Sequence, residues 1–201
     1  MNDDDYSYVK DYYPIEDMDA YVRTGIFDRD MLIDYWVEEM LYPCELNENT
    51  RDELKIIFDY QLAEFEAEKA EWPDVTDCEL LENVLEQLAV QGIVCSHHVG
   101  LYKTDGYGTA SREFLSHPDK SSVVGYCYYT FDEMMRATEG DGLVISFGSI
   151  PDDDNEEDLH KIGLAVRKAF EAEGFKVDWY GNPELMLPMR AIVLEDFTWQ
   201  Q

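Results

Sequence analysis

The densest group of potentially reactive side chains lies in the segment GIVCSHHVG, which contains Cys95, His97 and His98. The apolar, β-branched start of this segment predicts a short strand. Side chains alternate along a strand, so Cys95 and His97 share one face, and Cys127 of another apolar segment could approach them there. Together, Cys95, His97 and Cys127 would supply zinc with three ligands and leave one position open.

A second interpretation of these residues is structural. The usual paired spacings of zinc ligands are absent from the sequence, which favours a buried, hydrogen-bonded histidine beside an inert thiol. A cysteine nucleophile is disfavoured because a thiolate needs a locally positive environment, whereas this chain is strongly acidic. The sequence contains no dinucleotide-binding or Walker glycine loop. The sequence therefore predicts no cofactor and favours a non-enzymatic protein over an enzyme.

The chain has 45 acidic and 15 basic residues, which gives a formal net charge of −30. Its hydrophobic content of 45% and aromatic content of 13% are too high for a disordered acidic protein, so the acids belong to a folded surface. Such a surface repels nucleic-acid phosphates and anionic lipids and attracts basic proteins. We expect a basic protein partner, with no direct binding of nucleic acid or membrane.

The cysteines and the hydropathy pattern indicate a compartment. The four cysteines are widely scattered and form no CxxC pair, so neither a disulfide framework nor a zinc ribbon is implied. The N-terminus has no basic region followed by an apolar core, and no apolar run approaches membrane-spanning length. The sequence predicts a soluble cytoplasmic protein and leaves its oligomeric state open.

The first half of the chain is predicted to be helical. Residues 1–14 form an acidic, tyrosine-rich tail, and about four helices follow within a helical subdomain of residues 15–91. Asp28 is a suitable N-cap for the second helix. Capping boxes, in which a threonine precedes a glutamate by three positions, begin the third and fourth helices at Thr50 and Thr76.

The segment 125–148 organises the second half, because two apolar β-prone runs flank a short helical pattern. These runs predict two central strands covered on both faces and paired in parallel through a right-handed crossover. The preceding segment, 101–122, is predicted to be rich in turns, with turns at Asp105-Gly106 and Gly108 and one helical turn at 110–115.

A long helix over residues 155–173 and further strands at 93–99, 175–180 and 189–193 complete the prediction. The expected fold class is α+β, with the helical segment followed by a mixed sheet of about five strands and packed helices. Residues 92–201 would form this α/β subdomain, in one compact unit with residues 15–91.

Acidic residues alternate with tyrosines near the N-terminus, and a second acidic run occupies a predicted loop. Tyrosine is a favoured interface anchor, and carboxylates steer basic partners. The acidic loop lacks the glycine and terminal glutamate of an EF-hand, and its acids complement the dipole of the following helix. An alternative is that the tyrosines have no binding role. The expected partner-binding residues are Tyr6, Tyr8, Asp11, Tyr12, Tyr13, Asp152, Asp153 and Asp154.

Five short motifs follow one another over most of the chain, and each occurs once: FDRDMLIDYW, GIVCSHHVG followed by TDG, GYCYYTFDEMMRA, GLVISFG and EGFKVDWYG. In this succession the chain resembles a bacterial family that carries a domain of unknown function. The resemblance implies an α+β fold and no established activity. It also implies that family members keep a histidine at His97, the pair Asp105-Gly106 and an aspartate at Asp132. The acidic N-terminus and the acidic loop after Pro151 depart from the family pattern.

The leading functional hypothesis is a non-enzymatic binding protein of the immunity or inhibitor type, which docks a basic partner through carboxylates and tyrosine anchors. The first alternative is a small metal-dependent or cysteine-dependent enzyme centred on Cys95, His97, Asp105 and Cys127. The second alternative is a structural or assembly component. It would differ from the leading hypothesis, a binding protein, mainly by self-association.

Overall fold

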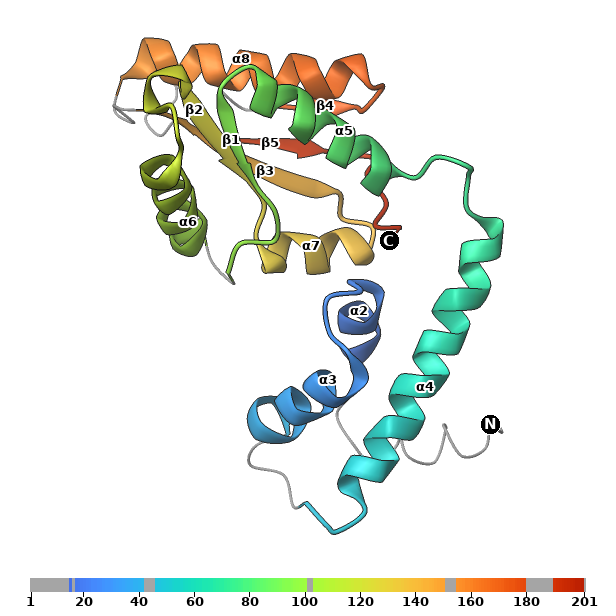
Figure 1. Cartoon of the computed structure of the whole chain (residues 1–201). Helices are drawn as coiled ribbons and strands as arrows, with labels where there is room; N and C mark the ends of the chain where they lie inside the picture. The colour runs from blue at the N-terminus through green and yellow to red at the C-terminus, as the bar shows by residue number, and fades with distance from the viewer. Residues whose placement is uncertain are drawn as a thin grey trace. The chain divides into compact units, whose positions relative to one another are not determined.

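A computed structural model of the chain describes residues 15, 17–41, 46–100, 103–150, 155–179 and 190–200. Within these residues, helices occupy the first part and a five-stranded mixed sheet with further helices occupies the second (Figure 1). The predicted α+β fold class is confirmed. The chain divides into two compact units, Met1–Asp74 with Gln200–Gln201 and Val75–Trp199.

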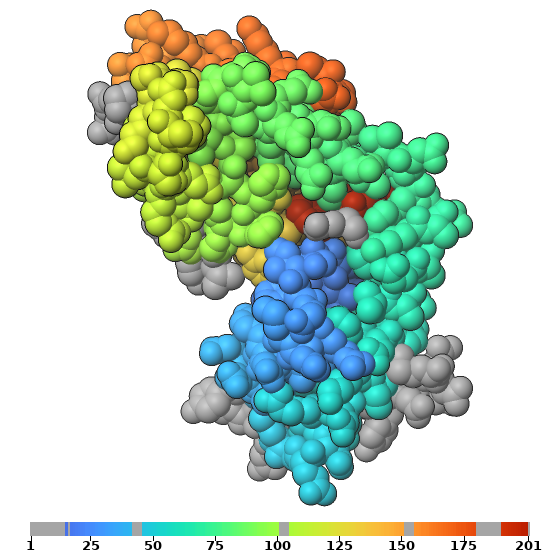
Figure 2. Space-filling view, viewed as in Figure 1, coloured from blue at the N-terminus to red at the C-terminus, as the bar shows by residue number. Residues whose placement is uncertain are grey.

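The first unit is built from α2 (Met18–Arg23), α3 (Arg29–Tyr35), a π-helical turn η1 (Trp36–Met40), α4 (Thr50–Glu68) and a 3-10 turn η2 (Lys69–Glu71). Helices α2 and α3 pack along α4 (Figure 2). The apolar faces of these helices form its core, which includes Met18, Leu32, Ile33, Trp36, Leu54 and Ile57.

Two helix starts in the first unit test the predicted caps. The carboxylate of Asp28 accepts a hydrogen bond from the Met31 amide at 2.9 Å, so this predicted N-cap is confirmed. The start of α4 differs from the prediction, because Asn49 is the N-cap and Thr50 is the first helical residue. The hydroxyl of buried Thr50 instead accepts a hydrogen bond from the Asn47 amide at 2.9 Å and closes the preceding turn.

The sheet of the second unit has the strand order β1-β2-β3-β5-β4. Its strands are β1 (Ile93–Ser96), β2 (Gly125–Tyr128), β3 (Leu143–Ser149), β4 (Val177–Asp178) and β5 (Ala191–Leu194). Only β1 and β2 run parallel among these described strands, and the other neighbours are antiparallel. β2 and β3 are both inner strands of the sheet.

The predicted parallel pairing of the strands within residues 125–148 is wrong, because β2 and β3 are antiparallel. The helix between them, α7 (Phe131–Thr138), is only eight residues long. It is followed closely by Gly142, whose positive φ of 74° suits glycine and turns the chain back toward β2. The chain therefore reverses direction after α7 and does not cross over.

Helix α6 (Lys103–Ser116) is the crossover between the parallel strands β1 and β2. The turns predicted at Asp105-Gly106 and Gly108 are wrong, because all three residues belong to this helix. Gly106 faces the ring of Tyr128 so closely that a Cβ atom would lie 2.1 Å from Cε2 of the ring. The glycine therefore permits close packing of a helix on a strand.

The remaining helices of the second unit are α5 (Asp77–Val90) and α8 (Glu156–Ala172), which pack against each other and against the sheet. In Figure 1, α5 and α8 lie on one side of the sheet, and α6 and α7 lie on the other. Thr76 and Glu79 form the predicted capping box at the start of α5. Asn155 caps α8 by accepting hydrogen bonds from the amides of Glu157 and Asp158.

The two units divide after Asp74, whereas the sequence suggested a boundary at residues 91–92. The reason is that α5 packs on β1 and α8, so its apolar face belongs to the core of the sheet. None of the helices in the described ranges is both long and apolar enough to cross a membrane.

Candidate functional site

Strands β1 and β2 bring Cys95 and Cys127 together. The two residues are direct partners in the parallel register, and their Sγ atoms lie 3.4 Å apart. The Cys95 thiol is half-buried and donates to the carbonyl of Ile93, whereas Cys127 is fully buried. The sequence prediction that Cys127 approaches Cys95 from a neighbouring strand therefore agrees with the structure.

The environment of Cys127 keeps it a thiol. Its hydrogen-bond contact with Cys95, together with burial, raises the pKa of the Cys127 thiol well above its ordinary value. A reactive cysteine nucleophile needs the opposite shift. Cys127 is therefore unsuited to the role of an activated nucleophile at neutral pH.

Two residues beyond Cys95 and Cys127, just after the ends of β1 and β2, His97 meets Tyr129. The Nδ1 atom of His97 lies 3.2 Å from the Tyr129 hydroxyl, and the two rings are edge-on at 5.8 Å. Desolvation, with a smaller contribution from His98, lowers the pKa of His97, and burial raises the pKa of the Tyr129 hydroxyl. At neutral pH the pair is thus an uncharged imidazole beside an uncharged phenol.

We name Cys95, His97, Cys127 and Tyr129 the thiol–tyrosine cluster. Within the residues that the structure describes, no three histidine, cysteine, aspartate or glutamate side chains gather as metal ligands. The predicted set of Cys95, His97 and Cys127 consequently does not assemble as a three-ligand site there. The cluster contains two thiols in contact and an uncharged pair of imidazole and phenol.

Asp105, which the enzyme hypothesis placed with the cysteines, lies elsewhere. It belongs to the first turn of α6 and abuts Gly100. Alternation along β2 directs Gly125 and Cys127 toward the α8 side, where Gly125 meets Ile162, and directs Tyr128 toward α6. Asp105 and the two cysteines are therefore on opposite sides of the sheet. Asp132 is exposed in the first turn of α7.

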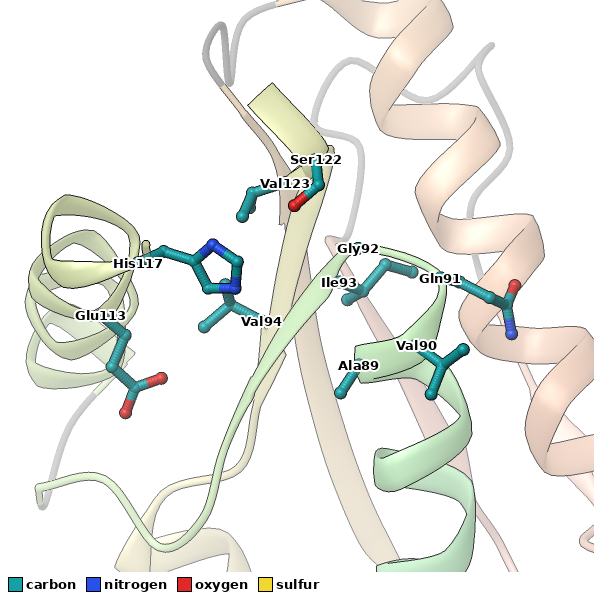
Figure 3. Close-up of a pocket in the computed structure, with 10 residues that line it drawn as sticks. All are labelled: Ala89, Val90, Gln91, Gly92, Ile93, Val94, Glu113, His117, Ser122 and Val123. Carbon is teal, nitrogen blue, oxygen red and sulfur yellow. The ribbon is translucent and has the colours of Figure 1, made fainter. Parts of the chain in front are cut away.

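A second feature is a groove beside β1, the terminal strand of the described sheet. Helices α5 and α6 lie on either side of β1 in Figure 3, and Figure 2 shows their surfaces exposed on one face. The groove has a volume of about 410 Å³. We call it the edge groove; its apolar lining includes Ala89, Val90, Ile93, Val94 and Val123.

Two polar side chains face the edge groove: Glu113 of α6 and His117, the residue that directly follows this helix (Figure 3). The Glu113 carboxylate accepts a hydrogen bond from the Ser96 hydroxyl at 2.7 Å, which ties it to the end of β1. The His117 Nδ1 atom contacts the Asp119 backbone. Val90, on the opposite wall, is 90% exposed. The groove thus combines apolar walls with one carboxylate.

The edge groove was missed in the sequence because residues 101–122 were expected to form turns. The only signal is the spacing of Glu113 and His117, four residues apart, which places them on one face if the segment is helical. The glycines Gly106 and Gly108 obscured that helix. The apolar wall from α5 is a tertiary feature with no local pattern.

The positive charges of the chain are largely neutralised by its own carboxylates. Arg23, for example, contacts Asp19 at 2.7 Å and Glu68 at 2.6 Å, which raises the pKa of Arg23 and lowers the pKa of Glu68. Other basic side chains in the described ranges also pair with carboxylates: Arg29, Arg51, Lys55, Lys69, Arg136, Lys161, Arg167 and Lys176. The acidic surplus therefore dominates the surface potential.

The partner-binding residues expected from the sequence lie outside the described residues. This holds for Tyr6, Tyr8, Asp11, Tyr12 and Tyr13 and for Asp152, Asp153 and Asp154. The acids that directly follow, from Glu156 to Asp158, form the exposed first turn of α8, where they complement the helix dipole as expected.

A family model described as a domain of unknown function, DUF6891, matches residues 12–201. The chain belongs to the DUF6891 family. The expected resemblance to a family carrying a domain of unknown function is thereby confirmed. The match includes the thiol–tyrosine cluster and the edge groove, and it leaves out residues 1–11 of the acidic tail. We found no match to this DUF6891 protein among curated proteins or solved structures.

Proposed function

We propose that the protein is a binding module of the immunity or inhibitor type, which docks a basic protein partner. The observation that supports it best is the distribution of charge. Nine basic side chains on the described residues already contact carboxylates, while acids outnumber bases by 45 to 15 in the whole chain. Such a surface speeds encounter with a cationic protein and disfavours anionic ones.

The edge groove is the docking site that we propose for a basic, extended segment of this partner. β1 is a terminal strand, and a terminal strand can accept an additional strand through its backbone. Apolar side chains of the segment would contact Val90 and Val94, and a lysine or arginine would pair with Glu113. The volume of about 410 Å³ accommodates a few side chains of such a segment.

The acidic tail and loop supply further contacts in this proposal. Tyr6, Tyr8, Tyr12 and Tyr13 would act as desolvated anchors, and Asp11 with Asp152, Asp153 and Asp154 would meet basic side chains. In an inhibitor, these carboxylates would occupy the surface with which a cationic toxin or nucleic-acid enzyme binds phosphates. We propose that this activity is cytoplasmic, which suits a chain whose four cysteines are widely scattered in the sequence and form no CxxC pair.

The first experiment is affinity capture from the lysate of the native host at low and at high salt, followed by mass spectrometry. It nominates a basic partner, whose binding to the purified protein is then measured by calorimetry. We expect the affinity to fall at least tenfold between about 50 mM and 300 mM NaCl, because the Debye length shortens. An affinity unchanged by salt would contradict the electrostatic docking.

A matched pair of variants tests the edge groove itself. Glu113→Gln keeps the shape of the side chain and removes its charge, so we expect weaker binding and a smaller salt dependence. Glu139→Gln, at the exposed C-cap of α7, is the control and leaves affinity within twofold. Equal affinities for the two variants would remove the groove from the proposal, whereas salt-dependent binding would still support the basic partner.

A further inference from the structure

The thiol–tyrosine cluster contains a pair of thiols for which the proposed binding function has no use. Cys95 and Cys127 are register partners on adjacent parallel strands, 32 positions apart in the chain, with their Sγ atoms at 3.4 Å. Neighbouring strands lie about 4.8 Å apart. This spacing falls within the range of Cα separations that disulfides span, about 4.4 to 6.8 Å.

Closing the sulfur–sulfur distance from 3.4 Å to the bond length of about 2.05 Å needs rotation of two side chains and no change of register. The two thiols also differ in accessibility, since Cys95 is half-buried and Cys127 is fully buried. An oxidant from solvent therefore reaches Cys95 first. Cys78, the other described cysteine, lies on α5, outside the sheet.

We propose that Cys95 and Cys127 are a modification site at which a low-molecular-weight disulfide, such as oxidised glutathione, installs a reversible disulfide bond. Cys95 loses its proton to solvent, and its thiolate attacks one sulfur of the glutathione disulfide. A mixed disulfide forms, and one glutathione thiolate leaves.

In the second step Cys127 attacks the Cys95 sulfur and transfers its proton to the departing glutathione sulfur, so the second glutathione leaves as a thiol. The first glutathione thiolate takes up from solvent the proton that Cys95 released. The two protein thiols are oxidised by two electrons, and one glutathione disulfide is reduced to two thiols. The raised pKa of Cys127 makes this second step the slower one.

The bond would link the terminal strand β1 covalently to β2. It would also close a loop of the chain that contains α6. Because β1 forms the floor of the edge groove, the modification would restrict the strand on which we propose that a partner docks. The site itself rests only on the placement of the two thiols, and its test is independent of any partner.

The test uses the purified full chain, equilibrated with a series of oxidised and reduced glutathione mixtures and then acid-quenched. We expect the intact mass to fall by two hydrogen atoms, and peptide mapping to show one cross-link between Cys95 and Cys127. Dithiothreitol should restore the original mass. A persistent glutathione adduct on Cys95, a cross-link through another cysteine, or four free thiols throughout would each overturn the proposal.

Two variants sharpen this test. Cys95→Ser, at the more accessible position, should abolish the loss of two hydrogens, whereas the control Cys78→Ser should retain it. If Cys95→Ser fails to fold, the peptide map of the unaltered chain decides alone, because it reports the linked residues directly. Retention of the mass loss in folded Cys95→Ser would overturn the proposal.

Discussion

At the scale of single residues, the contact between His97 and Tyr129 is an uncharged hydrogen bond at the end of two parallel strands. Its stability depends on the imidazole remaining neutral. Partial desolvation of the imidazole, with a smaller contribution from the neighbouring His98, is the physical cause of the lowered pKa of His97.

The pH dependence of stability follows from this lowered pKa. Between the ordinary value of 6.5 and the lower folded value, the unfolded chain binds a proton that the folded chain does not. The contribution of His97 to the free energy of unfolding is therefore present above pH 6.5 and declines as the pH falls below it. Between pH 6.5 and 5, we expect the free energy of unfolding to fall less in His97→Gln than in the unaltered protein. Urea denaturation at each pH measures both values.

Nuclear magnetic resonance gives a direct check on the same residue. The imidazole resonances of His97 should titrate below 6.5 in the folded protein. A midpoint at or above that value would contradict the desolvated, uncharged arrangement of His97 and Tyr129.

A glycine substitution tests the packing of α6 on the sheet. Gly106→Ala places a methyl group 2.1 Å from the Tyr128 ring, and we expect a loss of about 1–3 kcal/mol in the free energy of unfolding. Gly108→Ala is the matched control on the same helix, where a Cβ atom meets nothing within 4 Å. That control should stabilise the protein by about 0.5–1 kcal/mol through helix propensity. Similar effects of both variants would contradict the described packing.

At the scale of secondary-structure elements, the guanidinium group of Arg23 joins α2 to α4. Its guanidinium donates to both carboxylate oxygens of Glu68, at 2.6 and 2.8 Å, and its carbon atom lies 5.3 Å above the centre of the Phe65 ring. This bidentate, partly shielded arrangement is stronger than an ordinary surface ion pair.

Arg23→Met retains the aliphatic contact and removes the charge, so we expect a loss of about 1 kcal/mol in the free energy of unfolding. Arg29→Met is the control, because Arg29 pairs with Asp59 in a more exposed position and should cost less than about 0.5 kcal/mol. The difference between the variants should shrink in acid, as protonation of Glu68 removes its partner charge. Chemical denaturation, monitored by circular dichroism, measures the free energy of unfolding of both variants. Equal losses would contradict a stronger contribution from Arg23 than from Arg29.

Local chemistry made several elements predictable from the sequence. Asp28, and Thr76 with Glu79, were identified as helix starts because capping needs only a few adjacent residues. Helix α6 was missed because its glycines favour turns locally, whereas contact with the sheet stabilises the helix. The direction of β3 relative to β2 was also unpredictable, since a short connecting helix permits both directions.

The candidate sites were predictable to the same limited degree. Strand alternation was sufficient to suggest that Cys127 could approach Cys95, and the register places the two side by side. Alternation could not show which side of the sheet each helix covers. It therefore could not predict that Asp105 and the cysteines lie on opposite sides of the sheet. The edge groove depends on how α5 and α6 flank β1, which no local pattern encodes.

At the scale of the whole molecule, the formal net charge of −30 has a measurable energetic effect. Repulsion among carboxylates opposes the compact state, and salt screens that repulsion. We expect Tm to rise as NaCl increases from about 10 mM to 150 mM, where the Debye length falls from about 30 to 8 Å. Differential scanning calorimetry at constant pH measures the effect, and a Tm that falls with salt would show that the ion pairs outweigh the repulsion.

The position of β5 in the sheet has a consequence for synthesis of the protein on the ribosome. β5 is the last of the described strands in the chain, yet it lies between β3 and β4 and pairs with both. Until β5 emerges, β4 has no strand neighbour, and the apolar strand β3 presents an open edge of the kind that pairs with other chains. The second unit can therefore complete its sheet only after β5 has been synthesised, and until then the open edge of β3 exposes the nascent chain to association with other chains.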